Sequence, residues 1–341
     1  MMKSIIEVQK KLLPDLLQIM QKRVYILQHI RVMQPVGRRS LSNNLGISER
    51  VLRGEVQFLK EQDLIHIHPS GMTLTEQGAE LLPAMEEMVK EVSGLSIMEE
   101  KLKRALNLKE VIVVSGDSDQ SPWVKKELGR ACVQTLNQRL EGNETIAVAG
   151  GTTLAAVADM MTPSDKQKHT LFVPARGGLG ENVENQANTI CAKMAKRAQS
   201  NYRLLHVPDQ LSVEAYQSII EEPTIRDLLH VIRSSNIVLH GIGDAKTMAD
   251  RRRTPHDDVE KIEQLKAVGE AFGYYFNQEG EVVHKVQTAG IQLDDLKNIP
   301  CVIAVAGGAS KAKAIKAYMK QAIDHILITD EGAAKELLRE L

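Results

Sequence analysis

Cysteine and aromatic residues are both scarce in this chain of 341 residues. The three cysteines, Cys132, Cys191 and Cys301, lie far apart and form no CxxC pair. This spacing excludes a disulfide framework and favours buried free thiols in a reducing compartment. Aromatic residues make up only 3% of the chain and hydrophobic residues 43%, so we expect a globular protein with an aliphatic core.

Long hydrophobic runs are also missing. The first 23 residues place apolar side chains at helical spacing, but Glu7, Pro14 and Asp15 interrupt them. A membrane span needs about 20 apolar residues, and a secretion signal needs an unbroken apolar stretch. We therefore expect a cytoplasmic protein with no membrane partner, and the length favours two or three domains.

Basic charge is concentrated near the N-terminus, although the net charge of the whole chain is −1. Positions 22 to 60 hold two acidic residues and eight basic ones. The basic residues are Lys22, Arg23, Arg31, Arg38, Arg39, Arg50, Arg53 and Lys60. Such a patch suits nucleic acid, although the same residues could form a solvated helical face.

The same region has the pattern of a helix-turn-helix. We expect a short helix over 40–45, a tight turn at Gly46, and a second helix that Ser48 caps and that ends at Gln62. Apolar residues of the second helix recur at i, i+4 and i+7, which is typical of a core-facing stripe. The segment 63–78, DLIHIHPSGMTLTEQG, then predicts a hairpin that would form a wing.

The second helix also exposes arginine and glutamine along another face. Arginine can donate two hydrogen bonds to guanine, and glutamine can pair with adenine in the major groove. We therefore expect residues 1–83 to form a winged helix-turn-helix domain that binds double-stranded operator DNA, with a protein-binding helix as the alternative. The expected DNA contacts are Arg38, Arg39, Ser48, Arg50, Arg53 and Gln57. His66 and His68 of the hairpin have no further ligands nearby, so no metal site is assigned.

The remainder of the chain predicts a helical linker and a larger α/β domain. Residues 84–108 are helical in pattern, with an interruption at Ser93 and Gly94. From 109 to 341, apolar runs of strand length alternate with helical stretches, which indicates a doubly wound, mostly parallel sheet covered by helices. One exception is the stretch 272–286, FGYYFNQEGEVVHKV, which predicts two strands around a turn.

Four glycine-rich loops follow the predicted strands. They are AGGTT (149–153), ARGGLG (175–180), GIGDAK (241–246) and AGGASK (306–311). Glycine lets the backbone approach a ligand, and amides at the start of a following helix attract oxyanions. Glycine after a strand can also serve only a tight turn, but donors accompany three of these loops: Thr152 and Thr153, Arg176, and Lys311.

The spacing of these loops excludes the familiar nucleotide motifs. AGGASKAKA lacks the spacing of a P-loop, and GIGDAK lacks the third glycine and the acidic ribose ligand of a dinucleotide fold. A sugar phosphate fits better, because Gln186, Asp244 and Glu270 could bind its hydroxyl groups. A sugar-phosphate isomerase or deaminase is the alternative, with Asp244, Glu270, His240 or His256 as acid and base, but no paired constellation supports it.

The combination of GGTTL, VPARGG, HGIGD and AVAGGASKAKAI after a winged helix resembles the SorC/DeoR class of bacterial sugar-responsive transcription regulators, and within it the repressors of glycolytic operons. The resemblance covers the whole chain and implies an effector domain similar to sugar-phosphate isomerase and deaminase folds. It also implies a homo-oligomer, dimer or tetramer, whose operator binding fructose 1,6-bisphosphate weakens. The implied effector contacts are Gly150, Gly151, Thr152, Thr153, Arg176, Gly177, Gly178, Gln186, Asp244, Arg251, Glu270 and Lys311, with Arg252 and Arg253 as further parts of a cationic lid.

Overall fold

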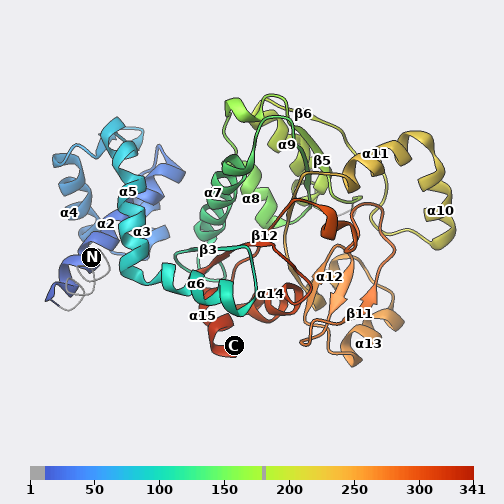
Figure 1. Cartoon of the computed structure of the whole chain (residues 1–341). Helices are drawn as coiled ribbons and strands as arrows, with labels where there is room; N and C mark the ends of the chain where they lie inside the picture. The colour runs from blue at the N-terminus through green and yellow to red at the C-terminus, as the bar shows by residue number, and fades with distance from the viewer. Residues whose placement is uncertain (1–11, 179–181) are drawn as a thin grey trace. The chain divides into compact units, whose positions relative to one another are not determined.

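The structure is a computed structural model that describes residues 12–178 and 182–341 (Figure 1). The chain divides into two compact units between Ile97 and Met98. This division falls inside the region 84–108 that was expected to link the domains. Helix α5 (Glu76–Ser93) runs across the expected boundary at 83, and α6 (Leu95–Ala105) runs across the division itself.

The first unit has the elements of a winged helix-turn-helix. Its stripe of buried apolar residues on α4 packs into one core with α2, α3, α5 and the hairpin. Gly46 has the expected left-handed conformation (φ 64°), and the Ser48 side chain accepts a hydrogen bond from the backbone N–H of Val51. The elements are α2 (Pro14–Met33), α3 (Arg38–Leu45), α4 (Glu49–Glu61), β1 (Ile65–His68) and β2 (Gly71–Leu74), followed by α5.

The predicted start of the short helix was two residues late. Helix α3 begins at Arg38 rather than at Ser40, because Gly37 is extended and acts as the N-cap residue. The antiparallel hairpin is as expected, with Ile65 paired with Leu74 and His68 with Gly71.

The larger unit contains a seven-stranded sheet in which every pair of neighbouring strands is parallel, in the order β3-β13-β12-β7-β4-β5-β6. Its strands are β3 (Glu110–Val114), β4 (Thr145–Val148), β5 (Leu171–Pro174), β6 (Asn201–Tyr202), β7 (Ile237–His240), β12 (Cys301–Val305) and β13 (Ile326–Asp330). From β4 the chain proceeds outward through β5 and β6, whereas from β7 it proceeds the other way through β12 and β13. The order therefore reverses between β4 and β7, and in such sheets ligands bind at the carboxyl ends of the strands beside this point.

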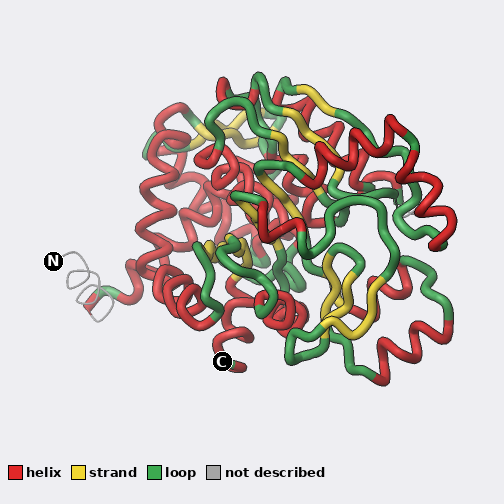
Figure 2. The backbone as a smooth tube through the Cα atoms, turned by 45° about the vertical axis from the view of Figure 1, so that its right-hand side comes forward, coloured by secondary structure: helices red, strands yellow, loops and turns green. Residues whose placement is uncertain are grey.

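Helices lie on both sides of this sheet (Figure 2), which confirms the doubly wound architecture. Helices α7, α8 and α9 pack on one another and bury alternate residues of the strands in one aliphatic core. The helices of the larger unit are α7 (Pro122–Arg139), α8 (Thr152–Met160), α9 (Ala187–Ala198), α10 (Val213–Glu221), α11 (Pro223–Arg233), α12 (Ala245–Arg251), α13 (His256–Gln264), α14 (Ala312–Met319) and α15 (Glu331–Glu340). No helix in the described ranges is long and apolar enough to cross a membrane.

A second, four-stranded antiparallel sheet lies beside the parallel one. The expected hairpin over 272–286 is present as β10 (Tyr274–Phe276) and β11 (Val282–Lys285), and it is extended by β9 (Gly269–Ala271) and β8 (Gly243–Asp244). The apolar run YRLLHV (202–207) is one of the runs of strand length that predicted the parallel sheet, but it contributes only to the two-residue edge strand β6. The chain leaves the sheet after Arg203, and Pro208 then bridges to Gly178.

Candidate DNA-binding and effector-binding sites

Three of the eight basic side chains in the N-terminal patch are neutralised within their own unit. Lys22 and Arg23 both form ion pairs with Glu55, and the Arg23 guanidinium also lies 3.5 Å from the centre of the Phe58 ring. Arg31 forms an ion pair with Glu86 at 2.6 Å. These three residues therefore hold α2 against its neighbours rather than adding free positive charge.

The other five basic residues form an exposed cationic surface on α3 and α4. They are Arg38, Arg39, Arg50, Arg53 and Lys60. None of these five residues has an ion pair among the residues that the structure describes. The remaining two predicted DNA contacts already have intrahelical partners, since Ser48 caps α4 and Gln57 donates a hydrogen bond from Nε2 to Glu61 Oε1 at 2.8 Å.

In the larger unit, residues from all four glycine-rich loops line one pocket of about 420 Å³. It lies at the carboxyl ends of β4 and β7, where the strand order reverses. The predicted residues in its lining are Gly150, Gly151, Thr152, Thr153, Arg176, Gln186, Asp244, Arg251, Glu270 and Lys311. Ten of the twelve residues that were expected to contact an effector therefore line one pocket.

The turn after β4 has the geometry of an anion site. A Cβ atom on Gly150 would lie 2.7 Å from the Asn185 carbonyl oxygen, so only glycine fits there, and Gly151 has a φ of +115°. Helix α8 starts directly after it, at Thr152. The first amide groups of a helix have no acceptor within the helix, and they carry partial positive charge. Thr152 and Thr153 thus bring both hydroxyl and amide donors to the pocket wall.

Three cations line the same pocket without an ion pair in the described part of the chain: Lys125, Arg251 and Lys311. Burial and the positive charges of Lys125 and Arg251 lower the pKa of Lys311, which the charges of Asp119 and Asp244 oppose in part. Sequence reasoning missed Lys125, because a lone lysine in the first turn of a helix has no distinctive pattern. The three charges favour an anionic ligand.

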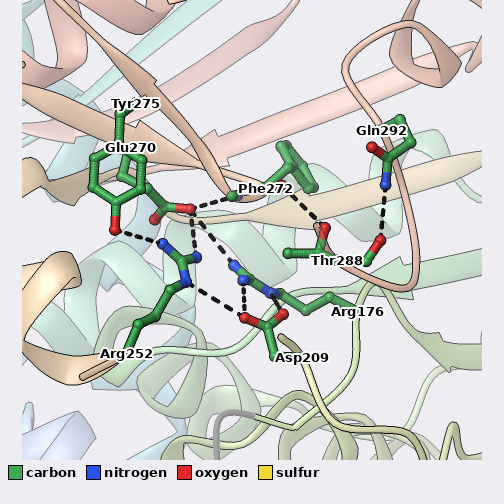
Figure 3. A network of polar contacts seen from close by, with 9 residues as sticks. Arg176, Asp209, Arg252, Glu270, Phe272, Tyr275, Thr288 and Gln292 are labelled. Atoms are coloured by element: carbon green, nitrogen blue, oxygen red, sulfur yellow. Dashed lines mark hydrogen bonds and ion pairs between the residues drawn. The ribbon is translucent and has the colours of Figure 1, made fainter. Parts of the chain in front are cut away.

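Arg176 was predicted to offer a free guanidinium to a phosphate, but the structure places it in a buried ion-pair network (Figure 3). Both its Nε and its Nη2 donate to the carboxylate of Asp209, and Glu270 Oε1 lies 3.7 Å from its Nη1. Glu270 Oε1 also accepts from Arg252 Nη2 at 2.7 Å and from the backbone N–H of Gly273 at 2.6 Å. Arg176 and Glu270 therefore reach the pocket as members of a network that neutralises both.

The expectation that Arg252 belongs to a cationic lid was wrong. Its side chain is 0% exposed, and its guanidinium contacts Glu270, Asp209 and the hydroxyl group of Tyr275. Burial alone would lower the pKa of Arg252, but the charges of Glu270 and Asp209 raise it. The adjacent Arg251 lines the pocket, whereas Arg253 is exposed and does not.

Gly177 and Gly178 lie outside the pocket lining. Their backbone N–H groups donate to the carbonyl oxygens of Ala289 and Val207, so these amides hold neighbouring loops together. The last two residues of the ARGGLG loop, Leu179 and Gly180, are outside the described ranges.

Among the described residues that line the pocket, neither His240 nor Asp244 has the setting of a general base. His240 lies in the lining, but its Nδ1 is 3.0 Å from the Gly241 carbonyl oxygen and its Nε2 is 3.2 Å from the Tyr318 hydroxyl oxygen. Burial, with a smaller contribution from His325, lowers the pKa of His240 to about 3. Asp244 caps α12 by accepting from the N–H and hydroxyl groups of Thr247. Within the described ranges, no cluster of three or more His, Cys, Asp or Glu side chains could hold a metal ion.

Comparison with known proteins assigns each of the two units to a protein family. Residues 19–89 match the family model "CggR N-terminal DNA binding domain", and residues 90–339 match "Putative sugar-binding domain". The crystal structure of the "putative SorC family transcriptional regulator from Enterococcus faecalis" has a TM-score of 0.67 and 48% identity, and covers 71% of this chain and 99% of that one.

Two curated relatives match over essentially the full length. The central glycolytic genes regulator of Priestia megaterium is 70% identical over 340 residues, or 99% of each chain. The protein of the same name from Bacillus subtilis is 62% identical over 339 residues, covering 99% of this chain and 100% of that one. The chain therefore belongs to the family of central glycolytic genes regulators, SorC-type transcription regulators that combine a DNA-binding domain with a sugar-binding domain.

Proposed function

We propose that this regulator represses glycolytic genes and that fructose 1,6-bisphosphate, bound in the pocket, releases it from its operator. The observation that carries the proposal is the meeting of Lys125, Arg251 and Lys311 with the start of α8 in one pocket. Unpaired cations and helix-terminal amides in a partly enclosed site favour phosphate groups over neutral sugars. We also propose that the protein acts in the cytoplasm as a homo-oligomer, because paired recognition helices bind spaced half-sites more tightly than one.

The size and polarity of the pocket suit a phosphorylated hexose. A volume of about 420 Å³ is within the range of small-molecule sites. One phosphate would bind at Thr152 and Thr153 together with Lys311, and the other would bind at Arg251. Gln186 and Asp244 also line the pocket, and their side chains could bind hydroxyl groups.

The direct test is a titration of duplex DNA, selected by the full-length protein from a randomised pool, in the presence and absence of fructose 1,6-bisphosphate. Coupling between two sites is typically 1–3 kcal/mol, so the DNA affinity should fall by about 5–150-fold. Glucose, which has no phosphate, is the control and should have no effect. Equal DNA affinity with and without the bisphosphate would exclude it as the effector.

The recognition helix can be tested separately. We expect the double substitution Arg50→Ala and Arg53→Ala to weaken binding to the selected duplex by at least about 30-fold, because each arginine–guanine contact contributes about 1–3 kcal/mol. Effector binding to the isolated protein should remain unchanged. Arg226→Ala, which removes an exposed arginine from the larger unit, is the control. Normal DNA affinity of the double variant would favour a protein partner for α4.

A further inference from the structure

The fourth glycine-rich loop, AGGASK after β12, has the same AGG sequence as the turn after β4, but its backbone binds side chains of its own chain. Its backbone N–H groups already have carboxylate acceptors. Gly308 donates to Asp330 Oδ2 at 2.7 Å, Ala309 donates to Asp117 Oδ1 at 3.3 Å, and Ser310 donates to Asp119 Oδ2 at 2.8 Å. An internal anion therefore occupies the position that a phosphate would take at this turn.

The three carboxylates come from the end of β13 and from the loop after β3, the two strands that continue the sheet beyond β12. Asp330 is the last residue of β13, is fully buried, and also accepts from the N–H groups of Ser118 and Ala333. Asp117 and Asp119 belong to the loop after β3, the strand on the far side of β13. Neighbouring parallel strands end at the same edge, so these loops meet although about 200 residues of sequence separate them.

Steric fit shows that the turn is built for this arrangement. Gly308 has a φ of +102°, and a Cβ atom placed on it would lie 2.5 Å from Asp119 Oδ1. A Cβ on Gly307 would lie 2.4 Å from Asp330 Oδ2. Glycine is therefore needed here so that the carboxylates, not an outside ligand, can approach the backbone.

The contact between Asp119 and Ser310 connects two cations of the pocket. Lys311 directly follows Ser310 in the turn, and Lys125 lies in the first turn of α7, which begins just after the Asp119 loop. Both lysines line the pocket, and they are close enough for one charge to lower the pKa of the other. A hydrogen bond that fixes the turn to the loop thus also fixes the spacing of the two ammonium groups.

We infer that Asp119, supported by Asp117, is a positioning residue of the effector site: its carboxylate fills the anion position of the turn and holds Lys311 beside Lys125. The inference rests on the proposed function and adds to it. The turn after β4 receives a phosphate directly, whereas the turn after β12 contributes only the Lys311 side chain. Asp119 itself is outside the pocket lining.

The test uses calorimetric titration of the full-length protein with fructose 1,6-bisphosphate. Asp119→Ala should weaken binding by about tenfold, whereas Asp119→Asn, which retains an oxygen acceptor for the Ser310 N–H, should remain within about threefold of the unmodified protein. Asp119→Glu, which displaces the carboxylate by one methylene group, should also weaken binding. Gln120→Ala, in the same exposed loop, is the matched control and should bind normally.

A double-mutant cycle distinguishes a role of Asp119 in positioning Lys311 from a general effect on the stability of the protein. If Asp119 acts through Lys311, Asp119→Ala should cause no further loss in a Lys311→Ala background. Additive losses, or normal binding by both Asp119→Ala and Asp119→Glu, would overturn the inference. Failure of the unmodified protein to bind the bisphosphate would instead count against the proposed function. The same cycle is then measured with pyrophosphate, where the same pattern is expected and additivity would again overturn the inference.

Discussion

Replacing Arg252 by methionine is expected to lower the free energy of unfolding of the larger unit by about 3–5 kcal/mol. The guanidinium is buried and contacts the carboxylates of Asp209 and Glu270. Methionine would fill much of the volume but leave two buried carboxylates to share the single guanidinium of Arg176. When one member of a buried ion-pair network is removed, the remaining charges are still desolvated but lose the interaction that compensated for it. Urea denaturation followed by circular dichroism measures the loss.

The neighbouring arginine provides a matched control for this prediction. Arg251→Met removes the same charge from the next position, but Arg251 lines the pocket and has no ion pair in the described ranges. We expect it to change stability by less than about 1 kcal/mol and to weaken effector binding. Equal stability of the two variants would contradict the structural role of Arg252.

Replacing Lys311 by methionine is expected to remove most of the effector response. The ammonium lies in a partly enclosed pocket that Lys125 and Arg251 also line, and it has no ion pair within the described ranges. A hydrogen bond to a charged group contributes about 1.5–3 kcal/mol, so affinity for fructose 1,6-bisphosphate should fall by about 10–150-fold. Thermal shift and calorimetric titration measure the loss, and DNA affinity without effector should be unchanged.

Lys313 is the matched control for Lys311. It lies two residues further along the chain, is exposed, and does not line the pocket. Lys313→Met should respond to the bisphosphate as the unmodified protein does. A normal response of Lys311→Met, or an equal loss in both variants, would remove Lys311 from the site.

Local signals in the sequence were sufficient for the helix-turn-helix and for most of the parallel strands, but not for β8 and β9 of the second sheet. The cap at Ser48, the left-handed Gly46 and the apolar stripe of α4 predicted the helix-turn-helix, because all three depend on near neighbours in the chain. Apolar runs likewise predicted the parallel strands. The strand order was not predictable, since it depends on pairings such as β3 with β13 between residues more than 200 positions apart.

Long-range partners also explain which site predictions were incomplete. The turns at Gly150 and Gly307 have the same AGG sequence, yet only the second meets carboxylates from distant loops. From the sequence alone, Arg176 is expected to be a free cation, but in the folded chain its guanidinium donates to the carboxylate of Asp209. Of the three consecutive arginines, Arg251 lines the pocket, Arg252 is buried and Arg253 is exposed. The local sequence does not predict this difference.

The most direct test of the central claim is the affinity of the full-length protein for fructose 1,6-bisphosphate, measured once without DNA and once with saturating operator duplex. Coupling between two binding sites is reciprocal. If a phosphorylated sugar in this pocket controls DNA binding, the bisphosphate must bind the DNA-bound protein more weakly, by the same factor by which it weakens DNA binding. Identical affinity for the bisphosphate in the two states would contradict the account.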